Sequence, residues 1–272
     1  MSAIKPIGSC MQTDSEGFLI GIAGPEKITA PWDAPVEEIR DAYISHLGSR
    51  LHSVYVRGSV AKGTAIEGVS DIDTLGVVHD SVAEIDDGWT ASFSSRMRSK
   101  YPFQAGIEIV FPELEQLLHA PERVGGRFTI KTQSACIYGE NLADSMQRFR
   151  PGHELIMHAF RIEAEMRGVC KDLEEDTDES QLRNVCQWLM KRIVRTGLEL
   201  VMEREQTYTR DLYPCFDRFS SHYPAQRSNM EQALCWAIEP TSDRQVIAAF
   251  VARFGPWLTR EVDGCFGPDR AE

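Results

Sequence analysis

The chain has 272 residues, 42% of them hydrophobic, which is enough apolar material for one large domain or two modest ones. Its net charge of −12 disfavours binding to nucleic acid, whose phosphates would be repelled except at a local basic patch, and favours neutral or cationic small molecules. The N-terminus lacks the apolar core of a signal peptide, and no apolar run approaches the length of a membrane span. The seven cysteines are scattered and form no Cys-x-x-Cys pair, as is typical of free thiols. We therefore expect a cytoplasmic protein without membrane contacts.

The first half of the chain mixes helix and strand patterns. Residues 1–35 are rich in glycine and proline and predict an irregular arm. Apolar side chains at helical spacing and β-branched runs then alternate. They predict helices over residues 36–51 and 89–100 and strands over 54–56, 74–78 and 106–111, whereas 128–137 fit a helix or a strand equally well.

The first two strands are joined by a segment punctuated with glycine. Gly58 and Ser59 follow the first strand directly, and Gly63 comes a few residues later. Glycine lets the backbone approach a ligand closely, and the free N–H groups at a helix N-terminus favour a phosphate. This segment is a candidate phosphate cradle.

Two aspartates stand at the mouth of the second strand. Asp71 and Asp73 are separated by Ile72, so both carboxylates point to one face of the strand while Ile72 points into the core. Like charges held side by side repel each other, and a cation between them relieves the repulsion. A hard divalent ion such as Mg²⁺ is the natural candidate.

A third carboxylate interrupts the apolar strand at 106–111. Ile107 and Ile109 face one side of this strand and Glu108 faces the other. Glu108 is either a functional group that faces the two aspartates or an edge-strand side chain that faces water.

The spacing of these residues resembles a known family. Gly58, Ser59, Gly63, Ser70, Asp71 and Asp73 match the glycine-serine to Asp-x-Asp signature of the polymerase-β-like nucleotidyltransferases. Within that superfamily the stretch is similar to the branch of minimal nucleotidyltransferases and aminoglycoside adenylyltransferases. The resemblance implies an α+β fold, with an N-terminal mixed-sheet catalytic domain at 1–150, arm included, and a C-terminal helical bundle at 151–272 that forms the other wall of the cleft.

The resemblance also implies a site and a reaction. Asp71, Asp73 and Glu108 would be the catalytic and metal-binding carboxylates, with Glu108 either a third ligand or the general base. Gly58, Ser59, Lys62 and Ser70 would bind the nucleotide. ATP would be the substrate and two Mg²⁺ ions the cofactors, and a nucleoside monophosphate would pass to a hydroxyl of a small molecule with release of pyrophosphate.

The second half of the chain is helical in pattern. Apolar spacing predicts helices over residues 154–171, 182–202, 230–238 and 245–262, with Gly255-Pro256 breaking the last. Several helices with short links form a bundle. The acidic run at 171–179 reads as a solvated loop or as an attractor of a cationic substrate.

A polar stripe follows one side of the helix predicted at 182–202. Gln187, Lys191, Arg195 and Glu199 recur at i, i+4 spacing. In one interpretation the stripe is a solvated face with an ion pair between Arg195 and Glu199. In the other it neutralises the triphosphate, and Lys191 then binds the nucleotide.

Two other functions stay open beside transfer to a small molecule. The first is a protein-modifying or antitoxin-like nucleotidyltransferase that acts on a protein partner, because minimal nucleotidyltransferases of such systems share the signature. The second is a binding module without catalysis, against which the intact set of Asp71, Asp73 and Glu108 argues.

Overall fold

The polypeptide divides after Phe149. In this computed structural model, which describes residues 4–79, 81–173 and 178–267, one compact unit comprises Ile20–Phe149 and the other Met1–Leu19 with Arg150–Glu272. We call them the α/β unit and the helical unit. The chain passes from the α/β unit to the helical unit between Phe149 and Arg150, and the first part of the expected arm groups with the helices and not with the sheet. The reason is hydrogen bonding, since Met11 N donates to Tyr208 O at 2.8 Å and Thr209 Oγ1 donates to Ser9 O at 2.7 Å.

The α/β unit is a layered α+β structure around one mixed sheet, as expected. The sheet has four strands in the order β3-β2-β1-β4, with β1 antiparallel to both neighbours and β2 parallel to β3. Its elements are α1 (Asp33–Leu47), β1 (Leu51–Arg57), α2 (Gly58–Lys62), β2 (Ile72–Val78), α3 (Trp89–Lys100), β3 (Ile107–Val110), α4 (Leu114–His119), α5 (Val124–Gln133) and β4 (Ser134–Gly139). The ambiguous stretch at 128–137 thus divides between the end of α5 and β4.

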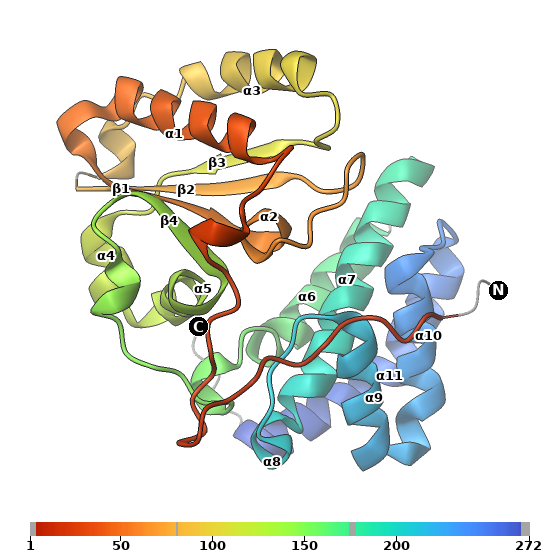
Figure 1. Cartoon of the computed structure of the whole chain (residues 1–272). Coiled ribbons are helices and arrows are strands. Elements are labelled where there is room, and N and C mark those ends of the chain that lie inside the picture. The colour runs from red at the N-terminus through yellow and green to blue at the C-terminus, as the bar shows by residue number, and fades with distance from the viewer. Residues whose placement is uncertain (1–3, 80, 174–177, 268–272) are drawn as a thin grey trace. The chain divides into compact units, whose positions relative to one another are not determined.

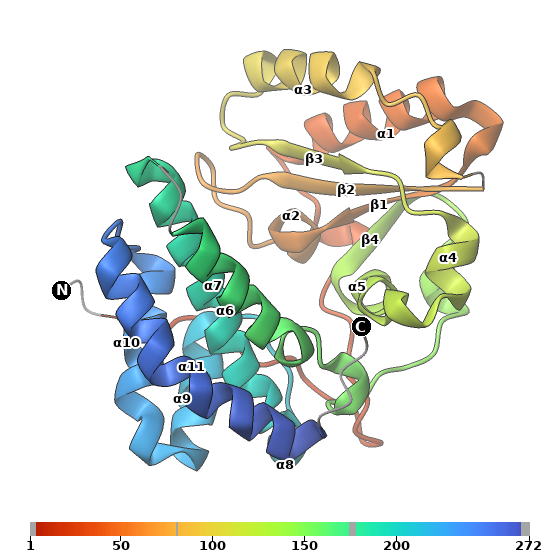
Figure 2. The ribbon, with the colours of Figure 1, turned by 180° about the vertical axis from the view of Figure 1, so that it is seen from behind.

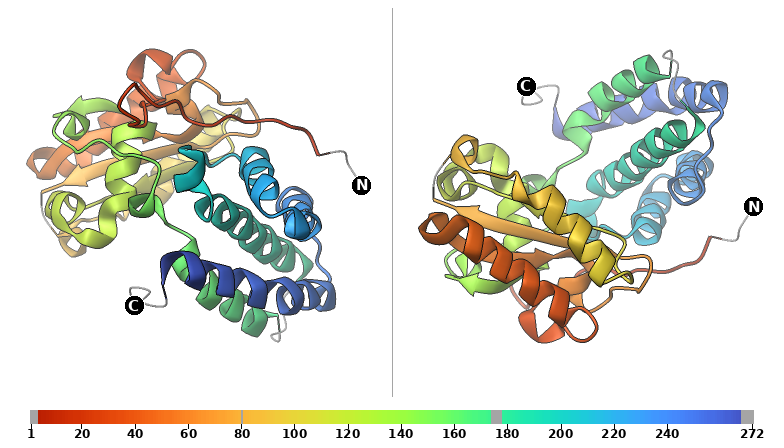
Figure 3. Two further views of the ribbon diagram at one scale, coloured as in Figure 1. Left: turned by 90° about the horizontal axis from the view of Figure 1, so that it is seen from below. Right: turned by 90° about the horizontal axis from the view of Figure 1, so that it is seen from above.

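Helices cover both faces of this sheet (Figure 1). On one face α1 and α3 lie side by side (Figure 3). His46 of α1 and Trp89 of α3 stack there at 4.4 Å between ring centroids. Val54, Val56 and Ile72 point to this face and are fully buried in its core. On the other face α4 and α5 pack on Tyr55 and Val77. Side chains of β1 and β2 alternate between these two apolar layers, so the charged side chains of the two strands stand at the end of the sheet.

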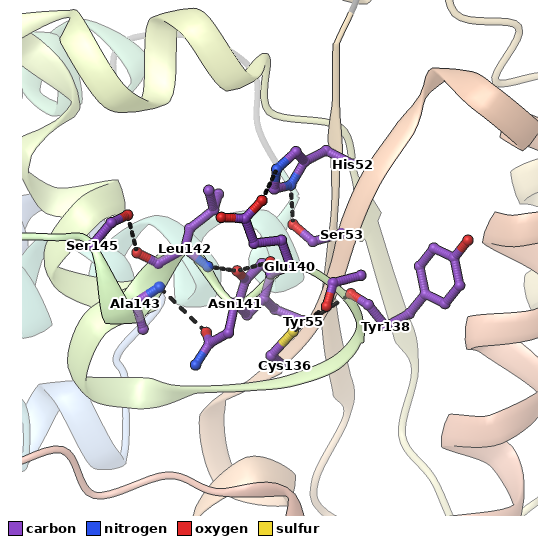
Figure 4. A network of polar contacts seen from close by, with 11 residues as sticks. His52, Ser53, Tyr55, Cys136, Tyr138, Glu140, Asn141, Leu142, Ala143 and Ser145 are labelled. Carbon is purple, nitrogen blue, oxygen red and sulfur yellow. Dashed lines mark hydrogen bonds and ion pairs between the residues drawn. The ribbon is translucent and has the colours of Figure 1, made fainter.

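The end of β4 is fastened to β1 by a polar network (Figure 4). Gly139 has φ +77°, and a Cβ there would lie 2.1 Å from the His52 carbonyl oxygen, so this turn requires glycine. Tyr55 Oη accepts the Leu142 N–H at 2.7 Å and donates to the Glu140 carbonyl at 3.3 Å. Burial raises the pKa of Tyr55 to about 12, so its hydroxyl remains a donor. The network closes the α/β unit a few residues before its last residue, Phe149.

The helical unit is built around one long helix. Its elements are α6 (Ile162–Asp172), α7 (Glu179–Glu199), α8 (Met202–Glu205), α9 (Leu212–His222), α10 (Arg227–Ile238) and α11 (Arg244–Phe266). Helix α7 packs against α6, α9 and α10, and α11 packs against α6 (Figure 2). Among the helices that the structure describes, none combines the length and apolar character needed to cross a bilayer.

Two expectations for this half were wrong, and one helix was missed. The helix predicted from residue 154 begins only at Ile162, after the short turns His153–Leu155 and Ala159–Arg161, because Glu199 takes the N–H groups that a continuous helix would need. Pro256 lies inside α11 and does not end it. Helix α9 was not predicted, although Pro214 suits its first turn.

Candidate active site

The candidate site lies where β1 and β2 run into the glycine-punctuated turn. Helix α2 starts at Gly58, directly after the last residue of β1, so its first N–H groups have no intrahelical acceptor. Gly58 has φ +74°, and Gly63 closes α2 with φ +70°, donating its N–H to the carbonyls of Ser59 and Val60. Ser59 and Lys62 are half-buried along this turn. The sequence therefore places its predicted phosphate-binding residues on one short helix.

Ser70 holds the loop that leads into β2. Its Oγ accepts the Ile66 N–H at 2.9 Å, its own N–H donates to Ile66 O at 2.9 Å, and its carbonyl accepts the Ala105 N–H at 2.9 Å. These contacts tie the loop before β2 to the residues before β3. Ser70 thus sets the approach of Asp71 and Asp73, while a contact from Ser70 to a nucleotide stays a prediction.

The register of the sheet brings three charged residues into one row. Arg57 on β1 is the partner of Asp73 on β2, and Asp73 is the partner of Glu108 on β3. Directly paired residues project from the same face of a sheet, so the three side chains lie next to one another. Asp71, at the mouth of β2, is exposed. Two of the three predicted carboxylates, Asp73 and Glu108, are thus placed together, with a cation that we had not predicted beside them.

Arg57 is this missed residue. Its Nη2 forms a short ion pair with Glu108 Oε2 and lies 3.8 Å from Asp73 Oδ1. The side chain of Glu108 is 46% exposed and that of Asp73 is 23% exposed. Glu108 stands on β3, the edge strand, and its carboxylate is half exposed. It nevertheless contacts Arg57, which also lies near Asp73. The signal that could have found Arg57 is its position, directly before Gly58 at the end of a strand antiparallel to the Asp73 strand.

Burial and neighbouring carboxylates control the charge of Asp73. Burial raises its pKa to about 7, the hydrogen bond with Glu108 and the charge of Asp71 act in the same direction, and Arg57 opposes them. A desolvated carboxylate next to other carboxylates is stabilised by any cation that reaches it. The charge of Asp73 therefore depends on both of its neighbours in the row, Arg57 and Glu108.

The backbone beneath the row is tied together on the opposite face of the sheet. Thr74 Oγ1 donates to the Glu108 carbonyl at 2.7 Å. Because that hydroxyl has one proton, it accepts its 3.0 Å hydrogen bond from Tyr43 Oη, which is fully buried in the core. The position of Glu108 relative to Asp73 is thus fixed from the core.

The donor set fits a hard divalent cation in its chemistry. Asp71, immediately before β2, and Asp73, on β2, offer carboxylate oxygens, the kind of ligand that Mg²⁺ prefers. Within residues 4–79, 81–173 and 178–267, no three His, Cys, Asp or Glu side chains converge on a common point. The carboxylate that would complete the set, Glu108, is the one engaged by Arg57.

The predicted polar stripe on α7 is not a solvated face. Glu199 is only 6% exposed and accepts the N–H groups of Met157, His158 and Ala159, at 2.6 to 3.1 Å. Arg195 donates to the Arg210 carbonyl at 3.3 Å, and not to Glu199 as the stitched-face reading required. Burial and the nearby Arg195 lower the pKa of Lys191. The stripe thus contains a buried carboxylate, Glu199, that is bonded to backbone, and two partly buried cations, Lys191 and Arg195.

A cavity of about 730 Å³ lies in the helical unit near these cations. Arg195 and Arg210 line it, together with Lys5 of the N-terminal segment and the rings of Tyr213 and Trp236. The predicted acidic loop at 171–179 is a different region, and its residues 174–177 lie outside the described part of the chain.

Comparison with known proteins gives a likeness among solved structures. No protein-family model and no curated protein matches the sequence. Among solved structures, the chain is similar to spectinomycin adenyltransferase AAD(9) from Enterococcus faecialis, determined with ATP and spectinomycin, with a TM-score of 0.50 and 12% identity over 85% of this chain and 99% of that one. The likeness confirms the fold that the resemblance of residues 58–73 implied: a mixed-sheet α/β unit followed by helices, as in an adenyltransferase.

Proposed function

We propose that the protein is a Mg²⁺-dependent nucleotidyltransferase that moves a nucleoside monophosphate, AMP from ATP, onto a hydroxyl of a small molecule and releases pyrophosphate. One observation carries the proposal: Asp73 on β2 lies beside a turn whose Gly58 has no room for a side chain next to it, and Asp71 immediately precedes that strand. The turn offers backbone N–H groups and the strand offers carboxylates, which are the two halves of a nucleotidyl-transfer site.

Each predicted site residue of the α/β unit has a proposed part. Asp71, Asp73 and Glu108 would hold Mg²⁺, with Glu108 either completing the ligand set or taking the proton of the acceptor hydroxyl. Bound Mg²⁺ would neutralise charge on the phosphates and lower the pKa of the incoming hydroxyl. Gly58 and Ser59 would hold phosphate oxygens through the start of α2, and Lys62 and Ser70 would bind the same nucleotide from beside them.

The helical unit is proposed to contribute to nucleotide binding as well. Lys191 would neutralise the triphosphate, in line with the gathering of cations on α7.

The acceptor is proposed to be a small molecule of the aminoglycoside class, since the solved neighbour was determined with spectinomycin and a negatively charged chain suits a cationic acceptor. The test is transfer from ATP labelled at the α-phosphate, with Mg²⁺, to an aminoglycoside panel and in parallel to a dialysed protein extract. Label on a small molecule supports the proposal, whereas label on a protein band supports a protein-modifying transferase acting on a partner.

A further inference from the structure

The candidate site contains a cation of its own, held by two of the carboxylates assigned to the metal. Arg57 pairs with Glu108 and stands 3.8 Å from Asp73, and the strand register keeps all three in one row. A guanidinium in this place neutralises charge that a divalent cation would otherwise neutralise. Two cations cannot both occupy the space between Asp73 and Glu108 without repelling each other.

We propose that Arg57 holds the place of a divalent cation between Asp73 and Glu108, and that a cation binding to the carboxylates displaces Arg57 from Glu108. Arg57 is thereby a positioning residue that sets the metal affinity of the site. The inference deepens the proposed function, since it rests on Asp71, Asp73 and Glu108 being the metal ligands.

Two further observations support displacement over a permanent ion pair. Nε of Arg57 is buried and has no hydrogen-bond partner, so the guanidinium is held mainly through one end. The Arg57 side chain is 28% exposed and that of Glu108 is 46% exposed, so both have access to solvent when they separate. By contrast, the backbone of Glu108 is fixed from the core by Thr74, so separation involves side chains and leaves the sheet in place.

The test uses electron paramagnetic resonance to measure the binding of Mn²⁺ to the full chain without nucleotide. Mn²⁺ serves as a spectroscopic substitute for Mg²⁺. Removing the competing charge in Arg57→Gln should tighten Mn²⁺ binding by roughly tenfold, because a like charge a few ångströms from the ion is lost. Arg57→Lys keeps the charge, and its affinity should stay within about threefold of the wild type.

A matched control removes the same charge elsewhere in the α/β unit. Arg40 is 34% exposed and pairs with Asp41 on α1, so Arg40→Gln changes the net charge equally without touching the row. Its Mn²⁺ affinity should not change. Arg57→Met, which also lacks the charge and has a straight apolar chain, replaces Arg57→Gln in the test if the glutamine variant does not fold.

A double-mutant cycle locates the effect. In a Glu108→Gln background, loss of Arg57 should give a smaller gain in affinity than in the wild type, because the contested carboxylate is already absent. Equal or weaker Mn²⁺ binding by Arg57→Gln, or no Mn²⁺ binding by any variant, overturns the proposal. Normal nucleotidyl transfer with unchanged Arg57→Gln affinity would refute this inference alone, and tighter Mn²⁺ binding without any transfer would refute the proposed reaction alone.

Discussion

The ideal Cβ position of Gly58 lies 2.5 Å from Asp73 Oδ2, so the carboxylate occupies the space that any side chain at position 58 would need. Gly58 also has φ +74°, a conformation that residues with a Cβ rarely adopt. The glycine of the turn and the aspartate of the strand are thus parts of one arrangement. This contact explains physically why the two sequence features occur together.

Gly58→Ala should therefore displace Asp73 and reduce the rate of transfer more than tenfold. It should also lower the stability of the fold by roughly 1–2 kcal/mol, the cost of a positive φ at an alanine. Gly68→Ala is the matched control, because Gly68 has φ +78° and no atom within 4 Å of its Cβ position. The control should lose similar stability in a denaturant titration but keep its transfer rate. Equal activity losses in both variants would show that backbone strain alone, and not the contact with Asp73, is responsible.

Asp73→Asn should abolish transfer and leave the protein at least as stable as the wild type. Burial disfavours the charged form of Asp73 and raises its pKa to about 7, so the neutral amide relieves a cost in the folded state. A thermal melt at pH 8 together with a transfer assay measures both effects. Retained transfer would remove Asp73 from the reaction, and a large loss of stability would show that its carboxylate is structural.

Glu199→Ala should destabilise the helical unit by about 3–5 kcal/mol. Three successive backbone N–H groups, of residues 157 to 159, donate to this buried carboxylate and would be left without acceptors. Glu203→Ala, an exposed change on the following helix, is the control and should stay within about 0.5 kcal/mol of the wild type. Urea unfolding compares the two, and similar values for both variants would contradict the assigned role of Glu199.

The stability of the helical unit should fall in mild acid through His158. Burial first, and then Arg192, Arg195, Arg210 and Arg161, lower the pKa of His158 to about 3. Its Nδ1 lies 3.0 Å from Arg192 Nη1, which can only donate, so this ring nitrogen carries no proton.

The sign of the effect follows from proton binding. Between pH 6.5 and about 3 the unfolded chain binds a proton at His158 that the folded protein does not. The stabilisation is therefore complete above pH 6.5 and is lost as the pH falls, by at most about 1.4 kcal/mol per pH unit.

The comparison with His158→Gln isolates this residue. Burial raises the pKa of Glu199 to about 7, which acts in the opposite direction, but Glu199 titrates in both proteins and cancels in the difference. The free energy of unfolding of the wild type, minus that of the variant, should decrease from pH 7 to pH 4. A difference that does not change with pH would refute the assignment.

The sequence predicted β1, β2, β3 and the carboxylates because their signals are local, whereas the stretch that holds β4 fitted a helix or a strand equally well. Glycines at positive φ, alternating faces on β2 and β-branched runs each depend on a few neighbouring residues. The fold that these features implied is confirmed by the structural likeness. The assignment of nucleotide-binding and metal-binding roles to individual residues stays a prediction.

The parts that the sequence did not predict depend on distant contacts. Arg57 joins the site only through the pairing of β1 with β2 and of β2 with β3, which sets residues 57, 73 and 108 side by side. The spacing of Glu199 fitted a solvated face or a nucleotide-binding stripe, yet its carboxylate binds backbone some 40 residues earlier in the chain. Residues before Leu19 pack with the helices because Ser9 and Met11 bond to residues 208–211. No local pattern encodes such partners.

The measurement that tests the central claim most directly is a pair of parallel reactions with Mg²⁺ and an aminoglycoside, one with ATP labelled at the α-phosphate and one with ATP labelled at the γ-phosphate. Asp73→Asn serves as the control in both. Nucleotidyl transfer predicts that the α-label moves to the acceptor and the γ-label appears in pyrophosphate, with neither event in the variant. Transfer of the γ-label to the acceptor, or equal transfer by the variant, would contradict the account.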